Sequence, residues 1–370
     1  MRRAEIQVPS QPLGLVDLPV PEPPSEGLVV KTTYAGVCHT DVHLWDDEMG
    51  LGNGKVTHFS DNPNYNFPIV PGHEISGVVH SLGPNPGPNA PDIKVGDKVI
   101  VFPWIGCRNC GLCKNGDPQL CPEAWNSLGM GAPGGYSTYV PVPERQYVIK
   151  VPESMPMDTA TMLPCSGLTT FHAVSAVRAT VEKMVALKGS ASLLIIGAGG
   201  LGLWCIQIAK AVLPPQTRVI VADITTEKLE TAKAAGADDV ILWDVKGTEE
   251  DMLALTKKAG GGGLDAAIDL VNAGPTTTRA LNALHHGGIL GSVGLFGGCL
   301  NIPLPVFALK TQCVRGVYVG NPQQLKDLVA LVDQRKLKPP PLVFYELDQA
   351  TEVLGLLKKG QIKGRAILKL

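Results

Sequence analysis

Seven residues of this sequence have the types and spacing of metal ligands. Four of them lie in one short loop and are separated by two, two and seven residues: Cys107, Cys110, Cys113 and Cys121. Four thiolates from one loop close a tetrahedral shell without an open position, as a structural zinc site requires. An iron–sulfur cluster is one alternative, although the last spacing in a ferredoxin run is three residues rather than seven. Unliganded thiols are the other, and we predict structural zinc.

Three further candidate ligands come from segments far apart in the chain. AGVCHTDVH supplies Cys38, PGHE supplies His73, and LPCSGLTTFHA supplies Cys165. Two thiolates and one imidazole fit a catalytic zinc whose fourth position stays open for water or substrate. Zinc acting as a Lewis acid would stabilise an alkoxide and make loss of hydride from its carbon possible. Each cysteine taken singly is explained as well by a small buried apolar side chain, so the prediction depends on the combination.

Polar residues beside these ligands have the chemistry of supporting groups. A ligating histidine usually donates its other N–H to a carboxylate, and either Asp41 or Glu74 could accept that bond. Thr40 could accept the proton of a substrate hydroxyl, and His43 could pass it to solvent near neutral pH. The alternative for His43 is a surface histidine without a role.

A glycine-rich turn indicates a dinucleotide. The apolar segment 192–196 runs into Gly197, Ala198, Gly199, Gly200, Leu201 and Gly202, which match GxGxxG, and a helical segment follows at once. The glycines permit a tight turn, close approach of a pyrophosphate and packing of the helix on the strand, while the helix N-terminus attracts phosphate. Asp223 follows 21 residues after Gly202, where a carboxylate binds the adenosine ribose hydroxyls and repels a 2′-phosphate, so NAD is favoured over NADP. A glycine turn without nucleotide and a solvated aspartate are the alternatives.

The segments that must position these residues show two different sequence patterns. Residues 1–150 are rich in Gly and Pro with short β-branched runs, which predicts mostly antiparallel β structure. From about residue 190, apolar strands alternate with helical stretches at 200–212, 226–235, 248–259 and 275–285. This alternation predicts an α/β fold with a doubly wound parallel sheet. A helix at 323–336 and a strand at 364–370 end the chain.

Composition narrows the class of protein. The chain has 370 residues and 44% apolar side chains, enough for a large core and two or three domains. Its formal charge of −2 disfavours nucleic acid and anionic membranes as partners. The sequence has neither an apolar run long enough to span a bilayer nor a signal peptide, and an odd number of cysteines, nine, fits a reducing compartment. We expect a cytoplasmic protein.

Taken in order, these motifs resemble the zinc-containing alcohol dehydrogenases of the medium-chain dehydrogenase/reductase superfamily. The likeness covers nearly the whole chain and includes AGVCHTDVH, PGHEISGVV, CRNCGLCKNGDPQLC, GGYSTYV, LPCSGLTTFHAV, IIGAGGLG and IKGRAILKL. It implies a GroES-like catalytic domain (1–160 and 322–370) and a Rossmann domain (161–321), with the active site in the cleft between them. It also implies two zinc ions per chain, NAD, a small alcohol or carbonyl substrate, and a homodimer or homotetramer.

The resemblance also implies roles for single residues. Cys38, His73 and Cys165 match the catalytic zinc ligands, Glu74 lies beside the metal, and Thr40 and His43 match the proton relay. The residues implied at the cofactor, besides the glycine turn and Asp223, are Lys228, with His39 and Arg365 near the pyrophosphate, Thr169 behind the nicotinamide, and the backbone of Val293 and Leu295 at the carboxamide. Trp45 and Trp104 match positions that line the substrate pocket, although a core tryptophan is the alternative for each.

Residues 46–66 form a polar stretch longer than in the shortest relatives. We interpret it either as a lid that shapes substrate choice or as an ordinary surface insertion. Rival functions are an NADP-preferring aldehyde reductase and a zinc-independent reductase of the same fold. The zinc-independent reductase would leave the three dispersed ligands without a role. A non-catalytic scaffold held by zinc and a zinc-ribbon nucleic-acid binder are the rivals outside the enzymes, and the near-neutral charge argues against the second.

Overall fold

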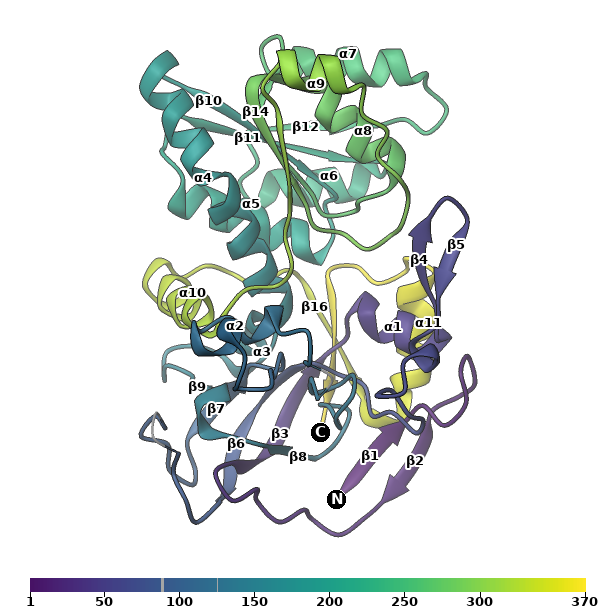
Figure 1. The fold of residues 1–370 in the computed structure, drawn as a ribbon, viewed down its shortest axis with the longest axis vertical. Helices are drawn as coiled ribbons and strands as arrows, with labels where there is room; N and C mark the ends of the chain where they lie inside the picture. Colours follow the sequence, from purple (N-terminus) through teal and green to yellow (C-terminus); the bar gives the residue numbers. More distant parts are fainter. Residues whose placement is uncertain (88–89, 125) are drawn as a thin grey trace. The chain divides into compact units, whose positions relative to one another are not determined.

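The computed structural model describes residues 1–87, 90–124 and 126–370, and their contacts divide the chain into two units (Figure 1). The first unit comprises residues 1–49, 57–168 and 320–370. The second comprises residues 50–56 and 169–319. Each unit is described by itself below.

The first unit is built on a mostly antiparallel sheet of seven strands. Its strand order is β16-β17-β3-β6-β7-β9, and β8 pairs with β3. Among the strand pairs of this sheet in the described residues, β16 and β17 run parallel and the others antiparallel. The strand bounds are β3 (Leu28–Gly36), β6 (Glu74–Leu82), β7 (Lys98–Val101), β8 (Tyr139–Val142), β9 (Val148–Lys150), β16 (Leu342–Glu346) and β17 (Arg365–Lys369), with a separate pair β1 (Arg2–Glu5) and β2 (Gly14–Asp17).

The first unit also contains helices, of which α3 and α11 contact strands of this sheet. α1 and α11 contact each other over a core that includes Ala35, Val37, Val353 and Leu368. α10 begins where the sequence supplies a complete N-terminal signal: Asn321 and Gln324 form a capping box, and Pro322 occupies the first helical position. The helix bounds are α1 (His39–Asp46), α2 (Gly111–Lys114), α3 (Met157–Thr161), α10 (Pro322–Arg335) and α11 (Ala350–Lys358).

The second unit contains a parallel sheet of six strands in the order β12-β11-β10-β13-β14-β15. The chain starts at the central strand β10, adds β11 and β12 on one side, and then adds the other three on the opposite side. Ligands of such sheets bind where the order reverses, at the carboxyl ends of β10 and β13. The bounds are β10 (Ala191–Ile196), β11 (Thr217–Asp223), β12 (Asp239–Leu242), β13 (Leu264–Asp269), β14 (Leu284–Ser292) and β15 (Cys313–Gly316).

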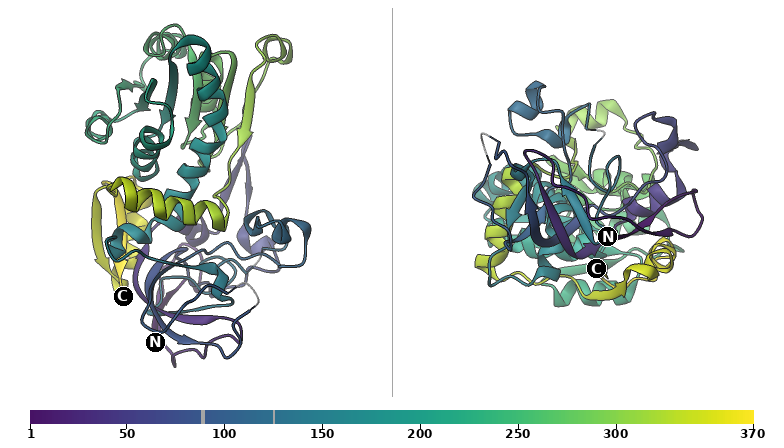
Figure 2. Two further views of the ribbon diagram at one scale, coloured as in Figure 1. Left: turned by 90° about the vertical axis from the view of Figure 1, so that its left-hand side faces the viewer. Right: turned by 90° about the horizontal axis from the view of Figure 1, so that it is seen from below.

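Helices cover both faces of the parallel sheet (Figure 2). Strand β10 is therefore buried along its whole length, which explains its uninterrupted apolar sequence. The bounds are α4 (Leu168–Lys188), α5 (Gly200–Val212), α6 (Thr226–Ala234), α7 (Glu249–Ala259), α8 (Gly274–Ala283) and α9 (Leu304–Leu309). In the described part of the chain, no helix is long and apolar enough to cross a membrane.

A small hairpin differs from the expected division of the chain. β4 (Met49–Gly52) and β5 (Lys55–Thr57) pair through Asn53 and Gly54, both with positive φ, as the tightest hairpin turns require. Residues 50–56 group with the second unit, although they lie within the stretch 1–160 that we predicted for the first domain. The physical reason is packing of the hairpin on residues 297–299.

Candidate active site

Two neighbouring strands bring Cys38 and His73 together. In the register of β3 and β6, Gly36 lies opposite Glu74. Cys38 follows Gly36 by two residues and is the N-cap of α1, while His73 immediately precedes Glu74. Because the strands are antiparallel, the end of one and the start of the other meet at the same edge of the sheet. Residues 35 positions apart in the sequence therefore become neighbours.

Cys165 completes the group from a third segment. It lies in a π-helical turn (Leu163–Gly167), in which the Gly167 N–H reaches back to the Met162 carbonyl at 3.0 Å. Wide turns of this kind are frequent at functional sites. The ligand atoms of Cys38, His73 and Cys165 all lie within 4.8 Å of one another, and all three side chains are buried. The three dispersed candidates thus converge within one unit.

The chemistry of these donor atoms fits a zinc ion. Nε2 of His73 is buried and has no hydrogen-bond partner among the described residues. A hydrogen bond with Cys165 holds the pKa of the Cys38 thiol well below its usual range, despite the opposing effect of burial. A lowered thiol pKa favours the thiolate, the form that ligates metal. Two sulfurs and one orphaned imidazole nitrogen therefore face one buried point, as a three-ligand zinc site requires.

Asp41 supports two of the three ligands. Its carboxylate accepts hydrogen bonds from the Cys38 N–H at 2.8 Å and the Gly72 N–H at 3.1 Å. One carboxylate oxygen lies 3.3 Å from Nδ1 of His73, and the buried Tyr136 hydroxyl donates to the other at 3.4 Å. Burial alone would lower the pKa of His73, but the Asp41 charge outweighs it and raises that pKa. Of the two carboxylates that we considered, Asp41 is the one beside the imidazole.

Glu74 has a different set of partners. Oε1 accepts the Ser166 N–H at 3.0 Å, and Oε2 pairs with the Arg365 guanidinium. The whole group is buried, and burial raises the pKa of Glu74 although Arg365 opposes the shift. Gly36 leaves room for it, because a Cβ there would lie 2.1 Å from Oε2. Glu74 thereby joins β6, the turn that carries Cys165, and β17.

The structure places Arg365 away from solvent. We predicted this residue at the cofactor pyrophosphate, and its observed partner is the Glu74 carboxylate. The Glu74 charge raises the already high pKa of Arg365 against the effect of burial, so the guanidinium stays charged. Its role at the pyrophosphate stays a prediction.

The proton-relay candidates lie on α1 directly after Cys38. The Cys38 thiol is 3.8 Å from the Thr40 hydroxyl oxygen. Thr40 and His43 are three residues apart and so share one face of the helix. Nδ1 of His43 lies 3.1 Å from the Glu48 carbonyl, which can only accept, so the ring carries its proton on Nδ1 and Nε2 is the proton acceptor. His39, the first residue of α1, is exposed.

The two tryptophans have different surroundings. Trp104 is buried, and its ring centroid lies 5.4 Å from that of His73. Its indole N–H donates to the carbonyl of Pro164, next to Cys165, at 3.4 Å. Trp45 donates to the Gln11 carbonyl and packs against the α11 core. Trp104 thus lies beside two of the candidate metal ligands, whereas Trp45 contacts a neighbouring backbone carbonyl and the α11 core.

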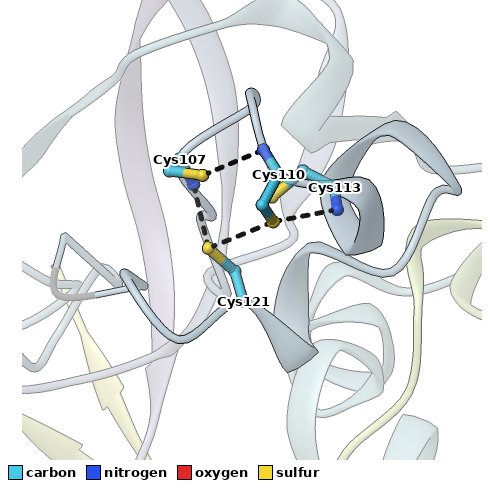
Figure 3. A group of neighbouring side chains, drawn as sticks. All are labelled: Cys107, Cys110, Cys113 and Cys121. Carbon is cyan, nitrogen blue, oxygen red and sulfur yellow. Dashed lines mark hydrogen bonds between the residues drawn. The ribbon is translucent and has the colours of Figure 1, made fainter.

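The four clustered cysteines point toward one another (Figure 3). Their sulfurs lie within 4.8 Å of one another, and Sγ of Cys110 and Sγ of Cys121 are 3.8 Å apart. Backbone N–H groups donate to the sulfurs, including that of Cys107 to Cys121 at 3.3 Å and that of Cys110 to Cys107 at 3.4 Å. Such donors lower the pKa of Cys107 to about 7. The loop therefore favours the thiolate of Cys107 through its own backbone, whereas burial raises the pKa of Cys113 to about 12.

The glycine turn of the second unit has the predicted form. Gly197 has φ +95°, and a Cβ on Gly202 would lie 2.0 Å from the Gly197 carbonyl oxygen. α5 begins at Gly200, and its N-cap Gly199 makes no side-chain capping bond. The first N–H groups of α5 therefore face the turn without a capping side chain, as in an anion-binding helix N-terminus.

The acid behind the turn contacts it directly. One oxygen of Asp223 accepts the Ala198 N–H at 2.8 Å, and the other accepts the Thr225 N–H at 3.0 Å. These bonds fix the carboxylate at the end of β11, beside the glycine turn. Lys228 lies half-buried in the following helix α6.

The remaining cofactor candidates lie at the start of α4 and directly after β14. Thr169 is buried at the start of α4, and Leu295 is exposed. The Val293 N–H already donates to the Asp269 carbonyl at 3.0 Å. The backbone group of Val293 that can meet the carboxamide is therefore its carbonyl. Asn272, which sequence reasoning missed, donates to the Gly294 carbonyl at 2.8 Å. The sequence does not show the positive φ of Asn272, 60°. The signal it does offer is the position of Asn272 shortly after the buried strand β13.

Comparison with known proteins agrees with this geometry. Residues 24–153 match the alcohol dehydrogenase GroES-like domain, and residues 200–334 match the zinc-binding dehydrogenase family. An NAD-dependent alcohol dehydrogenase of Sulfolobus acidocaldarius is 35% identical over 363 residues, 97% of this chain and 96% of that protein. The chain belongs to the zinc-binding alcohol dehydrogenase family. The fold class predicted from the sequence is thereby confirmed.

Further relatives of this zinc-binding dehydrogenase match over its whole length. An NAD-dependent alcohol dehydrogenase of Sulfurisphaera tokodaii is 34% identical over 370 residues, 100% of this chain and 99% of the relative. Among solved structures, an alcohol dehydrogenase from the archaeon Aeropyrum pernix superimposes with a TM-score of 0.84 at 27% identity, with both chains covered completely. The stretch 46–66 is thus part of a chain that aligns end to end with family members.

The Glu74–Arg365 pair yields a stability prediction for the zinc-loaded dehydrogenase. Glu74→Gln leaves a buried guanidinium without its counter-charge, so we expect the free energy of unfolding in urea to fall by about 3–5 kcal/mol. Glu153 offers a matched control, because its pair with Lys98 lies on the surface. Glu153→Gln should change the free energy by less than about 1 kcal/mol. Equal losses in the two variants would contradict the assignment of a buried ion pair.

Asp223 yields a prediction on cofactor choice. Asp223→Gly removes the carboxylate that repels a 2′-phosphate, so the ratio of kcat/KM for NADP to that for NAD should rise by about tenfold or more. Activity with NAD should also fall, because the Ala198 and Thr225 N–H groups lose their acceptor. Asp244, exposed after β12, serves as the control, and Asp244→Gly should leave the ratio unchanged. An unchanged ratio in Asp223→Gly would show that another residue selects the cofactor.

Proposed function

We propose that this enzyme interconverts alcohols with aldehydes or ketones, with zinc at Cys38, His73 and Cys165 and NAD at the glycine turn. The observation that carries the proposal is the convergence of these three buried ligands from distant segments onto one point. A zinc-independent reductase would leave this group without a role. A non-catalytic scaffold held by zinc would need only the four-cysteine cluster. It would give the three-ligand group no function.

The protein positions the substrate oxygen through the metal ligands and their supports. A zinc ion held by Cys38, His73 and Cys165 would supply a Lewis acid for the substrate oxygen. Asp41 orients the imidazole of His73 and the N-terminus of α1 at once. Glu74 fixes the turn that carries Cys165 through the Ser166 N–H. Trp104 packs on the imidazole and excludes water from that side.

Thr40 and His43 provide the path for the substrate proton. As the alcohol gives its proton to the Thr40 hydroxyl oxygen, Thr40 releases its own proton toward Nε2 of His43. The Glu48 carbonyl keeps the other ring nitrogen protonated, which leaves Nε2 as the acceptor. Histidine changes charge near neutral pH and so passes the proton on to solvent.

The cofactor residues divide by the part of NAD that they meet. NAD supplies the acceptor for the hydride that leaves the alcohol carbon. The glycine turn, the α5 N-terminus and His39 bind the pyrophosphate, with Lys228 and Arg365 as further cationic groups, and Asp223 binds the adenosine ribose. Thr169 packs behind the nicotinamide, and the backbone around Val293 and Leu295 meets the carboxamide. Trp104 lines the substrate pocket, as we also predicted for Trp45.

We infer that the enzyme works as a homodimer or homotetramer. Strand β15 is an edge strand of the parallel sheet, and exposed edges of this kind readily pair with another chain. Exposed apolar side chains gather in the same part of the sequence: Leu295, Phe296, Leu304, Val306, Leu309 and Tyr318. Exposed apolar side chains that gather in this way are often found at protein interfaces.

We also propose that the enzyme works in the cytoplasm. All nine cysteines are free thiols, and seven of them belong to the two ligand groups. Thiolate ligands survive in a reducing compartment, where disulfides are rare.

The zinc assignment predicts distinct losses at the two ligand groups. Cys38→Ala and Cys165→Ala should each lower zinc from two ions per chain to one and abolish turnover of an alcohol, while NADH binding survives. Cys110→Ser should lower zinc to the same count but act mainly on thermal stability. Elemental analysis, NADH fluorescence and a steady-state assay measure the three effects. Wild-type turnover in zinc-depleted Cys38→Ala would refute the catalytic assignment.

The assembly prediction uses two equally exposed apolar residues. Leu309 is 79% exposed and Val245 is 76% exposed, so neither supports the core of its own chain. Leu309→Lys should shift the mass in light scattering from that of a dimer or tetramer toward that of a smaller species. Val245→Lys, away from the apolar segment, should leave the mass unchanged. A wild-type protein that scatters as a monomer would overturn the prediction.

A further inference from the structure

Two glycines of the β4–β5 hairpin lie against the loop after β14, within the second unit. Gly50 lies against Gly297, and Gly52 lies against Gly298 and Cys299. A Cβ on Gly52 would be 2.4 Å from the Gly298 carbonyl oxygen and 2.6 Å from the Cys299 sulfur. Side-chain carbons essentially never come this close to a backbone atom. We call this contact between residues 50–52 and 297–299 the glycine seam, and its closest point requires that Gly52 has no side chain.

The segment on the far side of the seam is the loop 294–299, which follows β14. It contains Leu295, whose backbone we assigned to the nicotinamide carboxamide. Its side chains do not anchor it, since Leu295 and Phe296 are exposed. On the side away from the hairpin, Asn272 donates to the Gly294 carbonyl and Gly297 bridges to Ala273. The loop is therefore held between one asparagine-bearing turn and the hairpin.

The hairpin itself is fixed at its base. Asp47, buried just before β4, accepts the Ser60 N–H at 2.9 Å, and its carbonyl accepts a bond from Nδ1 of His58 at 2.8 Å. These bonds join the residues on either side of the hairpin within the first unit. Because these bonds fix the residues before and after the hairpin, they also restrict the positions that its turn can take.

We propose that the β4–β5 hairpin is a positioning element for the cofactor: through the glycine seam it holds the loop 294–299 in the conformation that receives the nicotinamide. The inference rests on the proposed NAD function and deepens it. It gives the stretch 46–66 a role at the cofactor, besides the lid and the surface insertion considered from the sequence. The seam should affect the nicotinamide end of the dinucleotide and leave the adenosine end, bound at the glycine turn, untouched.

Two glycines of the same hairpin make a matched pair for the test. Gly52 and Gly54 have similar backbone conformations, with φ +83° and +71°, so alanine is strained to a similar degree at each. They differ in surroundings, because a Cβ on Gly54 would meet nothing within 4 Å. Gly52→Ala therefore opens the seam, whereas Gly54→Ala imposes the backbone strain alone.

The binding experiment compares NADH with ADP-ribose, which lacks the nicotinamide. Gly52→Ala should raise the Kd for NADH about tenfold, the equivalent of one or two lost hydrogen bonds, and leave the Kd for ADP-ribose within about twofold. Gly54→Ala should leave both values near those of the wild type. Unchanged NADH binding in Gly52→Ala, or an equal loss of NADH and ADP-ribose, overturns the inference while the proposed function stands. Failure of the wild type to bind either ligand overturns both.

A second measurement needs no variant and so does not depend on whether Gly52→Ala folds. In the wild-type protein, NADH should slow hydrogen–deuterium exchange in segment 294–300 and also in the hairpin at 49–57. ADP-ribose should slow exchange at the glycine turn 197–202 without affecting the hairpin. The opposite result would be slower exchange in segment 294–300 with no change in the hairpin. It would show that the hairpin does not position the loop, and it would overturn the inference.

Discussion

The buried carboxylate of Asp41 is the contact on which the zinc centre depends. It accepts the N–H of Cys38, the N–H of Gly72 and the hydroxyl of Tyr136, and it stands beside Nδ1 of His73. A single side chain thus fixes the start of α1 and the turn before β6, the two segments that bring the first two ligands. These bonds hold both oxygens of the negatively charged carboxylate in place beside the ring of His73. The same charge raises the pKa of His73 and so makes the imidazole a stronger donor to a metal.

Much of this arrangement was readable from the sequence because its signals are local. The GxGxxG turn, the acid at the end of the next strand and the cysteine spacing each lie within one or two elements. α5 was predicted at 200–212, and it spans Gly200–Val212. The convergence of Cys38, His73 and Cys165 is of another kind, since no local pattern joins them. Their residue types, taken together with the other motifs, suggested that grouping, and the β3–β6 register and the π-helical turn account for it physically.

Other features escaped sequence reasoning for identifiable causes. α4 was missed although Ala173, Val174, Val177 and Val181 recur at helical spacing and are buried, so in that case the signal was present. For the hairpin, the Asn53-Gly54 turn is a recognisable signal, but its strands are short and polar. Its packing surface at 297–299 lies about 240 residues further along the chain, and no pattern in residues 46–66 points to it. Contacts between backbones at glycine leave almost no trace in a sequence.

Gly36 carries a consequence for efforts to stabilise the enzyme. Glycine within a strand weakens it by roughly 0.5–1 kcal/mol, so strand β3 would ordinarily be a target for a β-branched replacement. Here the missing side chain is the space in which the Glu74 carboxylate meets the guanidinium on the last strand. A valine that stiffened β3 would push that carboxylate out and release the turn beneath Cys165. At this one position, a substitution that makes the sheet more rigid would therefore disturb the metal centre.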